Sequence, residues 1–360
     1  MKLFIGLCVL HLLTLPAQAQ RKVNTDSVAQ AYRGALDLLD QLVRQNAPES
    51  FKQAVFITEN VYLGNSLDYA AFCDKIGQMT VLMKAWMKSN SLSNYRFEDS
   101  LNFEKNFAIF TIMKDSISVL NPDKGQLFST IPMIYDFDDY EGAKDWTKMF
   151  VSKLLFTYSG NCHSLPYLYK ILADQLGATS WISLAPNHLY IQNRSKKIGW
   201  YNTELTSGSF PTDGWIMASG YLPLKAVQSG IYMDTLSNQQ SIALCMLDLA
   251  KGYEHKTHNY YDGFILACCD SSLQYFPLNV QALLLKAETL KRLYEQQLLH
   301  NSTAAKDTYQ KMDALYFRLF DLGYREMPPK MYQDWLQSVL KEKSKYQNKR
   351  VSDALPSKAR

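Results

Sequence analysis

The sequence predicts an α+β protein, in which a helix packs on an antiparallel sheet between two mainly helical regions. Three observations carry this prediction. Apolar residues recur at three- and four-residue steps over much of the chain, as in amphipathic helices. Residues 179–205 instead contain short β-branched and aromatic runs, separated by the polar turn "NRSKK". A well-marked helical pattern directly precedes these runs, so a helix is available to cover the sheet.

The first 19 residues are typical of a secretory signal peptide. Lys2 precedes the apolar run "LFIGLCVLHLLTL", and "AQA" places small residues at the cleavage positions. This run is too short to span a bilayer, and no later segment offers about 20 consecutive apolar residues. Cleavage is therefore expected after Ala19, with export to the periplasm or the medium and no membrane span. Gln20 follows the cut where a lipid anchor would need a cysteine.

The charges and cysteines of the sequence limit the partners and ligands that are expected. The net charge is +4 and no block of like charge precedes the tail, so nucleic acid is not an expected partner. The acidic run at 136–139 lacks the spacing of a calcium loop and is assigned to a turn, and no cofactor is called for. Five cysteines follow the signal peptide at no metal-ligand spacing, so at least one thiol stays free or pairs between chains. They are Cys73, Cys162, Cys245, Cys268 and Cys269.

Residues 20–118 are predicted to be mainly helical. "DSVAQAYRGALDLLDQLVR" forms an amphipathic helix with Asp26 or Ser27 as its N-cap, and two further helical patterns lie within 51–88. The composition at 89–102 turns to Ser and Asn, which indicates a surface loop. The stretch "FAIFTIMKDSISVL" that follows is compatible with either a helix or a strand.

Residues 119–236 hold the predicted core. A helix beginning at Asn161 or Cys162 carries a leucine stripe and ends before Gly177. The strands "TSWISL", "NHLYIQ" and "IGWYNTEL" follow it. A hairpin centred near residue 195 places His188 opposite Asn202, and a centre at 196 places Glu204 there instead. Both lie on the face of the sheet that carries His188, because side chains alternate along a strand.

Residues 237–343 are predicted to be helical again. Pro277, Asn279, Ala282 and Ala287 resemble the junction between tetratricopeptide repeats, in which a Pro-x-Asn-x-x-Ala turn joins helix pairs. The match covers about two degenerate repeats. The polar residues 344–360 are predicted to form a disordered tail.

Four residues are candidates for chemistry. A helix N-terminus and a nearby imidazolium would both stabilise the Cys162 thiolate, and His188 is the candidate imidazolium. A third side chain must orient the ring, and Asn202 and Glu204 are placed to do so.

The neighbours of the thiol are assigned as follows. His163 points roughly 100° around the helix from the cysteine and is the weaker base. The Cys162 backbone N–H is one natural oxyanion donor, with Tyr158 or Asn161 as the other.

These residues resemble the transglutaminase-like superfamily of papain-like cysteine enzymes. The resemblance lies in "GNC", "LYKILADQLG", "PNHLYIQ" and "GWYNTELTSG", and covers about 50 residues from Phe156 to Gly208. It implies the order Cys, His, Asp. Trp200 matches the tryptophan that often precedes the acid, which puts Glu204 in the aspartate position, or else Asn202 serves as in the papain-like branch.

Two functions are compatible with the sequence. One is an exported cysteine hydrolase or acyltransferase that acts on amide bonds of a peptide or protein. The other is a non-catalytic interaction protein that uses the core and the helical repeats as a binding platform. The aromatic segment "SGSFPTDGWIMASGY" could line a groove for a partner, although Trp215 and Tyr221 are rather expected to pack against the sheet. The oligomeric state is left open.

Overall fold

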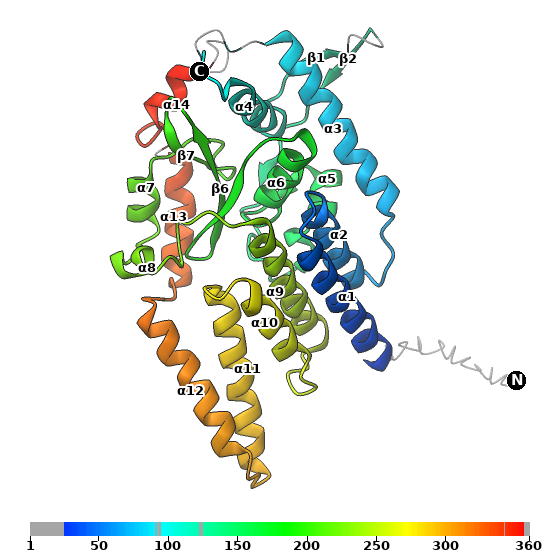
Figure 1. Cartoon of the computed structure of the whole chain (residues 1–360), viewed down its shortest axis with the longest axis vertical. Coiled ribbons are helices and arrows are strands. Elements are labelled where there is room, and N and C mark those ends of the chain that lie inside the picture. Colours follow the sequence, from blue (N-terminus) through cyan, green and yellow to red (C-terminus); the bar gives the residue numbers. More distant parts are fainter. Residues whose placement is uncertain (1–24, 91, 93–94, 122–124, 342, 356–360) are drawn as a thin grey trace, which may run out of the picture.

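An antiparallel sheet of three strands lies in the upper half of the molecule, in a mixed α+β arrangement (Figure 1). The computed structural model describes residues 25–90, 92, 95–121, 125–341 and 343–355, so the predicted signal peptide lies outside the described residues. The strands follow the order β5-β6-β7, and they are β5 (Trp181–Ala185), β6 (His188–Ser195) and β7 (Gly199–Thr203).

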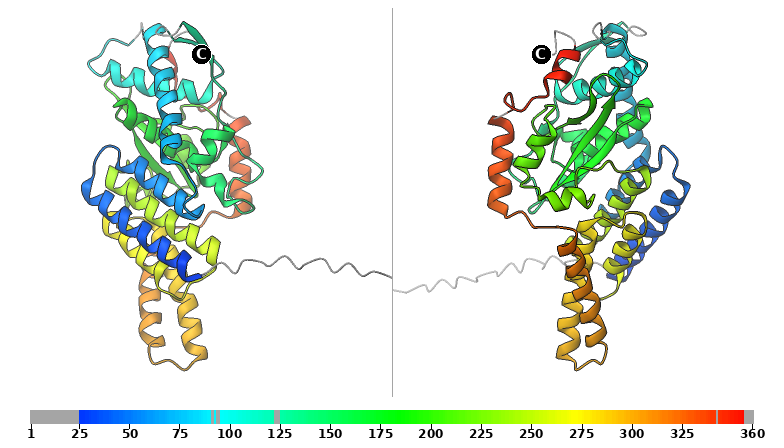
Figure 2. Two further views of the ribbon diagram at one scale, coloured as in Figure 1. Left: turned by 90° about the vertical axis from the view of Figure 1, so that its right-hand side faces the viewer. Right: turned by 60° about the vertical axis from the view of Figure 1, so that its left-hand side comes forward.

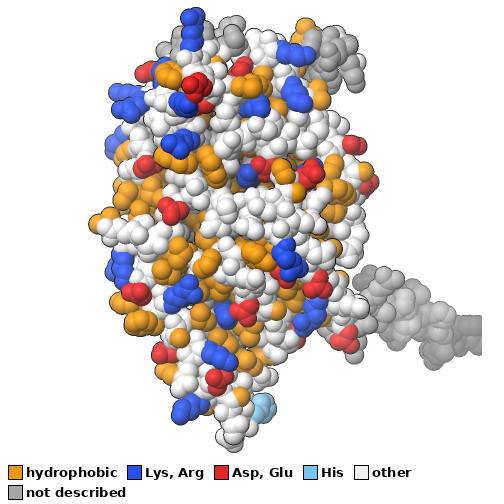
Figure 3. Space-filling model, in the orientation of Figure 1, with side chains coloured by type: hydrophobic (Ala, Val, Ile, Leu, Met, Phe, Trp, Pro, Cys, Tyr) orange, Lys and Arg blue, Asp and Glu red, His pale blue; other side chains and the backbone are white. Residues whose placement is uncertain are grey.

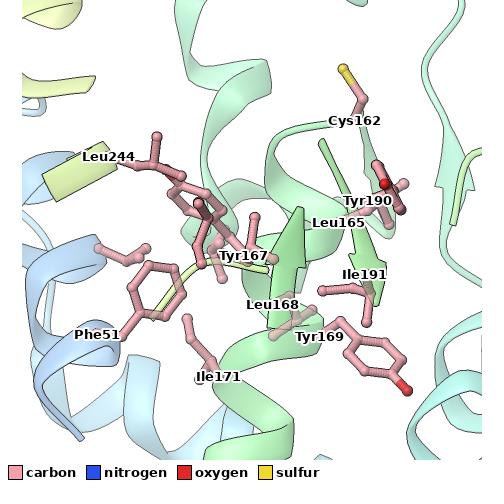
Figure 4. Close-up of a cluster of buried hydrophobic side chains, with 14 of the residues drawn as sticks. Phe51, Cys162, Leu165, Tyr167, Leu168, Tyr169, Ile171, Tyr190, Ile191 and Leu244 are labelled. Atoms are coloured by element: carbon pink, nitrogen blue, oxygen red, sulfur yellow. The ribbon is translucent and has the colours of Figure 1, made fainter. Parts of the chain in front are cut away.

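Helix α6 (Ser164–Leu176) covers one face of this sheet. Its apolar stripe is fully buried, and Leu165 and Leu168 point into the cluster shown in Figure 4. Gly177 ends the helix in the left-handed conformation, as the sequence predicts. Cys162 lies at the edge of this buried cluster, and its sulfur points away from the other labelled side chains (Figure 4).

Helix α4 (Ser100–Lys114) packs against α6 and β6. It begins two residues inside the predicted loop and includes the first half of the stretch that was compatible with helix or strand. The second half of that stretch enters the hairpin of β1 (Ser118–Asn121) and β2 (Gln126–Ser129). Phe107 and Ile109 are buried on opposite sides of α4, because the helix is enclosed by protein on most sides.

The first two helices pack on helices from the C-terminal part of the chain. Helices α1 (Thr25–Gln45) and α2 (Ser50–Tyr62) pack against α9 (Asn238–Thr257), and α1 also contacts α10 (Phe264–Tyr275). The ring of Tyr32 lies edge-on to Tyr253 and Phe264, with centroids 5.1 and 5.9 Å apart. Tertiary packing therefore crosses the predicted boundaries at 118 and 237.

The predicted repeat junction caps a helix. Asn279 Oδ1 accepts a hydrogen bond from the Ala282 backbone N–H at 3.2 Å, at the start of α11 (Val280–Leu299). Its Nδ2 donates to Ser272 Oγ on α10 at 3.1 Å, so the turn is tied to the preceding helix. Helices α11 and α12 (Ala305–Asp321) then form a hairpin that projects away from the sheet (Figure 2).

The end of the chain returns to the sheet. Helix α13 (Pro329–Lys341) lies beside it, outside the layer of C-terminal helices (Figure 2). The prediction of disorder from residue 344 is wrong up to residue 355, because α14 (Lys349–Ala354) is folded and buries Val351 and Ala354. Asn348 N donates to Phe210 O at 2.8 Å, so backbone pairing fixes this segment next to β7.

The remaining elements are the long helix α3 (Tyr69–Ser89), which packs against α4 and β1, and several short connections. The connections are β3 (Ile134–Tyr135), the 3-10 helix η1 (Trp146–Met149), α5 (Val151–Thr157), β4 (Ser159–Gly160), α7 (Asp213–Ser219) and α8 (Leu224–Gln228). Trp215 is buried, as expected, whereas Tyr221 is exposed, contrary to expectation. Charged side chains of both signs are interspersed on the face shown in Figure 3. No described helix combines the length and apolar character needed to cross a bilayer.

Candidate active site

Asn161 sets the position of Cys162 at the start of α6. Its carbonyl oxygen accepts the first helical hydrogen bond, from Leu165 N at 3.1 Å. Its Oδ1 accepts from His163 N and Ser164 N, at 3.0 and 3.1 Å, which is the geometry of an N-cap. Cys162 therefore lies in the turn that leads into α6, two residues before Ser164, where the helix dipole favours a thiolate.

A glycine is required immediately before this cap. A Cβ at Gly160 would lie 2.5 Å from Ser164 Oγ and 3.0 Å from Leu154. Gly160 belongs to β4, which pairs in parallel with β3 and brings Tyr135 alongside. In the "GNC" sequence, the glycine therefore allows the close approach of Ser164, the asparagine caps the helix, and the cysteine provides the thiol.

His188 and Glu204 form a buried pair. His188 Nε2 lies 2.6 Å from Glu204 Oε2, and both residues are 2–3% exposed. Glu204 Oε1 accepts a second hydrogen bond from Thr206 N at 2.8 Å. Burial raises the pKa of Glu204, but the interaction with His188 outweighs burial and the pKa is lowered. Burial likewise opposes the charge of His188, yet Glu204 raises the pKa of His188 to about 10.

The hairpin register differs from both predicted registers. Ser195 pairs with Gly199, so the hairpin is centred at residue 197 rather than 195 or 196. The place directly opposite His188 is therefore beyond the end of β7, and Glu204 reaches the ring diagonally from the same face. The shift arises because β6 continues to Ser195, so the turn begins at residue 196, three residues after the start of the polar run at Asn193.

Asn202 does not orient His188, which corrects one of the two predicted alternatives. Asn202 pairs with Gln192 in the sheet, and its Oδ1 accepts from Gln192 Nε2 at 3.3 Å. Its Nδ2 donates to Asp213 Oδ1 at 2.7 Å. Both polar atoms of the Asn202 side chain are therefore bonded to residues other than His188, and they hold β7 and α7 in place.

The thiol lies among one imidazole and two phenol groups. His188 Nδ1 makes no hydrogen bond of normal geometry within the described chain, so it is the ring nitrogen left for the sulfur. Cys162 Sγ lies 3.3 Å from Tyr332 Oη on α13. Burial raises the pKa of the thiol, but His188, followed by Tyr332 and Tyr135, outweighs burial and lowers it. The site therefore favours a thiolate–imidazolium pair.

Helix α13 covers this pair. The ring of Trp335 lies edge-on to His188 with centroids 4.5 Å apart, and Tyr332 lies one helical turn before it on the same face. Neither residue was predicted, since Tyr332 is 170 residues from Cys162 and carries no local motif. The cover leaves Cys162 only 8% and His188 only 3% exposed, and this burial strengthens the electrostatic interaction between the two groups.

The two side chains proposed from the sequence as the second oxyanion donor, Asn161 and Tyr158, have other surroundings. Asn161 Nδ2 donates to Tyr140 O at 2.9 Å, and Tyr158 ends α5 and lines a separate hollow. The hydroxyl of Tyr135 is instead buried without a hydrogen-bond partner among the described residues. Burial and the neighbouring Cys162 raise the pKa of Tyr135 well above its ordinary value, so it stays a neutral donor.

His163 forms a second buried pair. Its Nδ1 lies 2.9 Å from Met149 O and its Nε2 lies 3.0 Å from Asp248 Oδ2. Both partners are acceptors, so both ring nitrogens must donate and the ring is charged. Burial lowers the pKa of His163, but Asp248 outweighs burial and raises it. This ring is committed to Asp248 and is not a base for Cys162, which agrees with its predicted rank.

A cleft of about 310 Å³ opens beside the thiol. Cys162 and His188 lie on its wall on the sheet side, and α9 and the start of α11 form the opposite wall.

Comparison of the chain with protein-family models, curated proteins and solved structures found no match. The described residues contain no group of three or more metal-ligating side chains. Asp136 accepts from Asp138 N and Asp139 N within its turn.

Replacing Tyr332 by phenylalanine is expected to raise the pKa of Cys162. The hydroxyl that contacts the sulfur is removed, and a hydrogen bond to a charged group contributes about 1.5–3 kcal/mol. The ring remains packed on Trp335. The rate of alkylation of Cys162 as a function of pH measures the shift. Tyr294→Phe, on α11, is the control, and an unchanged profile in Tyr332→Phe would show that the hydroxyl does not stabilise the thiolate.

Proposed function

We propose that the protein is an exported cysteine hydrolase or acyltransferase that acts on amide bonds through Cys162, His188 and Glu204. The observation that carries this proposal is that the two ring nitrogens of His188 have different surroundings. Nε2 is bonded to Glu204, and Nδ1 has no partner among the described residues and is left for the thiol at the start of α6. The order Cys, His, acid on a helix and an antiparallel sheet is similar to that of the transglutaminase-like superfamily.

The reaction follows from these positions. The Cys162 thiolate attacks the carbonyl carbon, a C–S bond forms, and His188 Nδ1 gives its proton to the departing amine. The Cys162 N–H and the Tyr135 hydroxyl are the candidate donors for the oxyanion. Water or a second amine then attacks the thioester, His188 takes its proton, and the thiolate leaves. Glu204 holds the ring throughout and favours its charged form.

The second candidate function is a non-catalytic binding platform. The α11–α12 hairpin exposes large apolar side chains, and Leu299, Phe317 and Phe320 are each more than 70% exposed. Exposed apolar residues of this size mark interaction surfaces more often than chance allows. In this function Cys162 would be an ordinary buried thiol.

Alkylation with iodoacetamide between pH 5 and 9 separates the two functions. At pH 6 an ordinary thiol with a pKa of about 8.5 is less than about 1% ionised. We expect Cys162 to react at least about tenfold faster than Cys73 at pH 6, although Cys73 is the more exposed thiol. Mass spectrometry assigns the labelled site. His188→Ala should abolish the difference, and equal rates for Cys162 and Cys73 in the unmodified protein would support the platform.

A further inference from the structure

A lysine that lines the cleft beside the thiol has no counter-ion among the described residues. Lys251 projects from α9 on the same face as Leu244, Leu247 and Asp248, and all four line the cleft. Within the described parts of the chain, its ammonium group forms no hydrogen bond and no ion pair. A partly buried ammonium without a partner has lost hydration without compensation.

The two carboxylates nearest to Lys251 are engaged with other groups. Asp248 Oδ2 accepts from His163 and from the Tyr167 hydroxyl at 2.7 Å. Glu254 Oε1 accepts from the Tyr260 hydroxyl at 3.0 Å. Burial lowers the pKa of Lys251, and Asp248 and Glu254 do not fully offset it. The positive charge of Lys251 is therefore left for a group that enters the cleft.

A second donor in the same cleft also lacks an acceptor. Tyr232 is 3% exposed, and its hydroxyl has no hydrogen-bond partner among the residues that the structure describes. Buried polar groups are almost always paired in folded proteins, so an orphan hydroxyl facing a cleft indicates a missing acceptor. The cleft thus presents one cation and one neutral donor, and a carboxylate would satisfy both.

The position of Lys251 relates this acceptor site to the thiol. Lys251 lies three residues after Asp248, a rise of about 4.5 Å along α9. Asp248 holds His163, the residue next to Cys162. Cys162 and Lys251 line the same cleft, so one substrate molecule can place a carbonyl at Cys162 and a second group at Lys251.

We propose that the cleft binds an acyl donor with a free carboxylate, held by Lys251 and Tyr232 while its scissile amide lies at Cys162. The substrate class is a peptide with a C-terminal or side-chain carboxylate within a few residues of the amide. This inference rests on the proposed function, because it assigns the substrate of the same site.

Chloroacetyl peptides test this inference with the full chain. The thiolate displaces chloride from the chloroacetyl carbon and forms a stable thioether, so labelling of Cys162 reports binding without a known substrate. Chloroacetyl derivatives of one, two and three alanines are compared as free acids and as amides. For at least one length, we expect the acid to react about tenfold faster than its amide, with a preference that falls as salt rises.

Three variants assign this preference to the cleft. Lys251→Met should remove the preference for the acid, and Lys251→Arg should keep most of it because the charge remains. Tyr232→Phe should reduce it. Lys291→Met removes the same charge from an exposed position on α11, outside the cleft, and should change nothing.

The outcomes distinguish this inference from the function on which it rests. Rapid reaction of Cys162 with iodoacetamide, combined with equal rates for acid and amide at every length, would overturn the carboxylate site alone. Retention of the preference in Lys251→Met would also overturn it. An iodoacetamide rate no higher than that of Cys73 would overturn the proposed function and this inference together.

Discussion

Replacing Glu204 by alanine is expected to destabilise the protein by about 3–5 kcal/mol and to abolish the selective reactivity of Cys162. The substitution leaves the imidazolium of His188 buried without its carboxylate partner, and removal of one partner of a buried ion pair is strongly destabilising. Burial then dominates and the pKa of His188 falls below its ordinary value. The thiolate loses its cationic partner, and its pKa rises.

Urea denaturation of the two proteins at several pH values measures this effect. A raised pKa in the folded state contributes stability that is fully present below the ordinary histidine pKa of about 6.5. This contribution is lost as pH rises through about 10. The difference between wild type and Glu204→Ala should therefore be largest near pH 6 and smaller above pH 10. Glu204→Gln keeps the shape of the side chain but removes its charge, and should restore only part of the reactivity.

Asn202→Ala is the comparison for Glu204. Asn202 is equally buried and also bonded, so its removal costs stability as well. The pH profile of Cys162 alkylation should nevertheless stay unchanged, because Asn202 bonds to Gln192 and Asp213 rather than to His188. The reverse result, a shifted profile in Asn202→Ala and none in Glu204→Ala, would make Asn202 the third member of the site.

Replacing Asn161 by alanine is expected to cost about 3 kcal/mol and to lower the alkylation rate of Cys162. Loss of a helix cap costs about 1 kcal/mol, and the fully buried side chain also leaves the Tyr140 carbonyl without its donor. The first turn of α6 then loses the bonds that hold the thiol toward His188. Denaturation and iodoacetamide labelling at pH 6 measure the two effects.

Asn279→Ala is the matched control for Asn161. Asn279 is also a buried cap, at the start of α11, and it also bonds to a neighbouring element. Its loss should cost a similar free energy of unfolding while the iodoacetamide reactivity of Cys162 is retained. Equal loss of reactivity in both variants would mean that Asn161 acts through global stability alone.

Local signals predicted much of the core. The start of α6, its end at Gly177 and the three strands depend on apolar periodicity, capping and turn residues, which a short stretch of sequence contains. The alternation of side chains along a strand also placed Glu204 on the face of His188, and this holds in any of the three registers that were compared. The hypothesis that Glu204 orients His188 requires only that both side chains lie on the same face of the sheet.

Other features depend on partners far away in the chain. Tyr332 and Trp335 reach the site because α13 returns to the sheet, and nothing in the local sequence specifies that return. The last folded segment reads as polar, yet Val351 is fully buried and lines a small hollow together with Phe103 and Phe107 of α4. Burial of a few small apolar residues against a distant surface has no signature in composition.

The return of α13 fixes an order of events during synthesis. A ribosome makes Tyr332 170 residues after Cys162, roughly 10–30 s later at ordinary rates of elongation. Until then the nascent chain carries the Cys162 thiol without the tyrosine that contacts it. Pairing of Asn348 with Phe210 comes later still and ties down the far end of the covering helix. A chain that ends before Tyr332 would lack the helix that covers Cys162. Its thiol would therefore be more exposed to oxidants than the same thiol in the full-length protein.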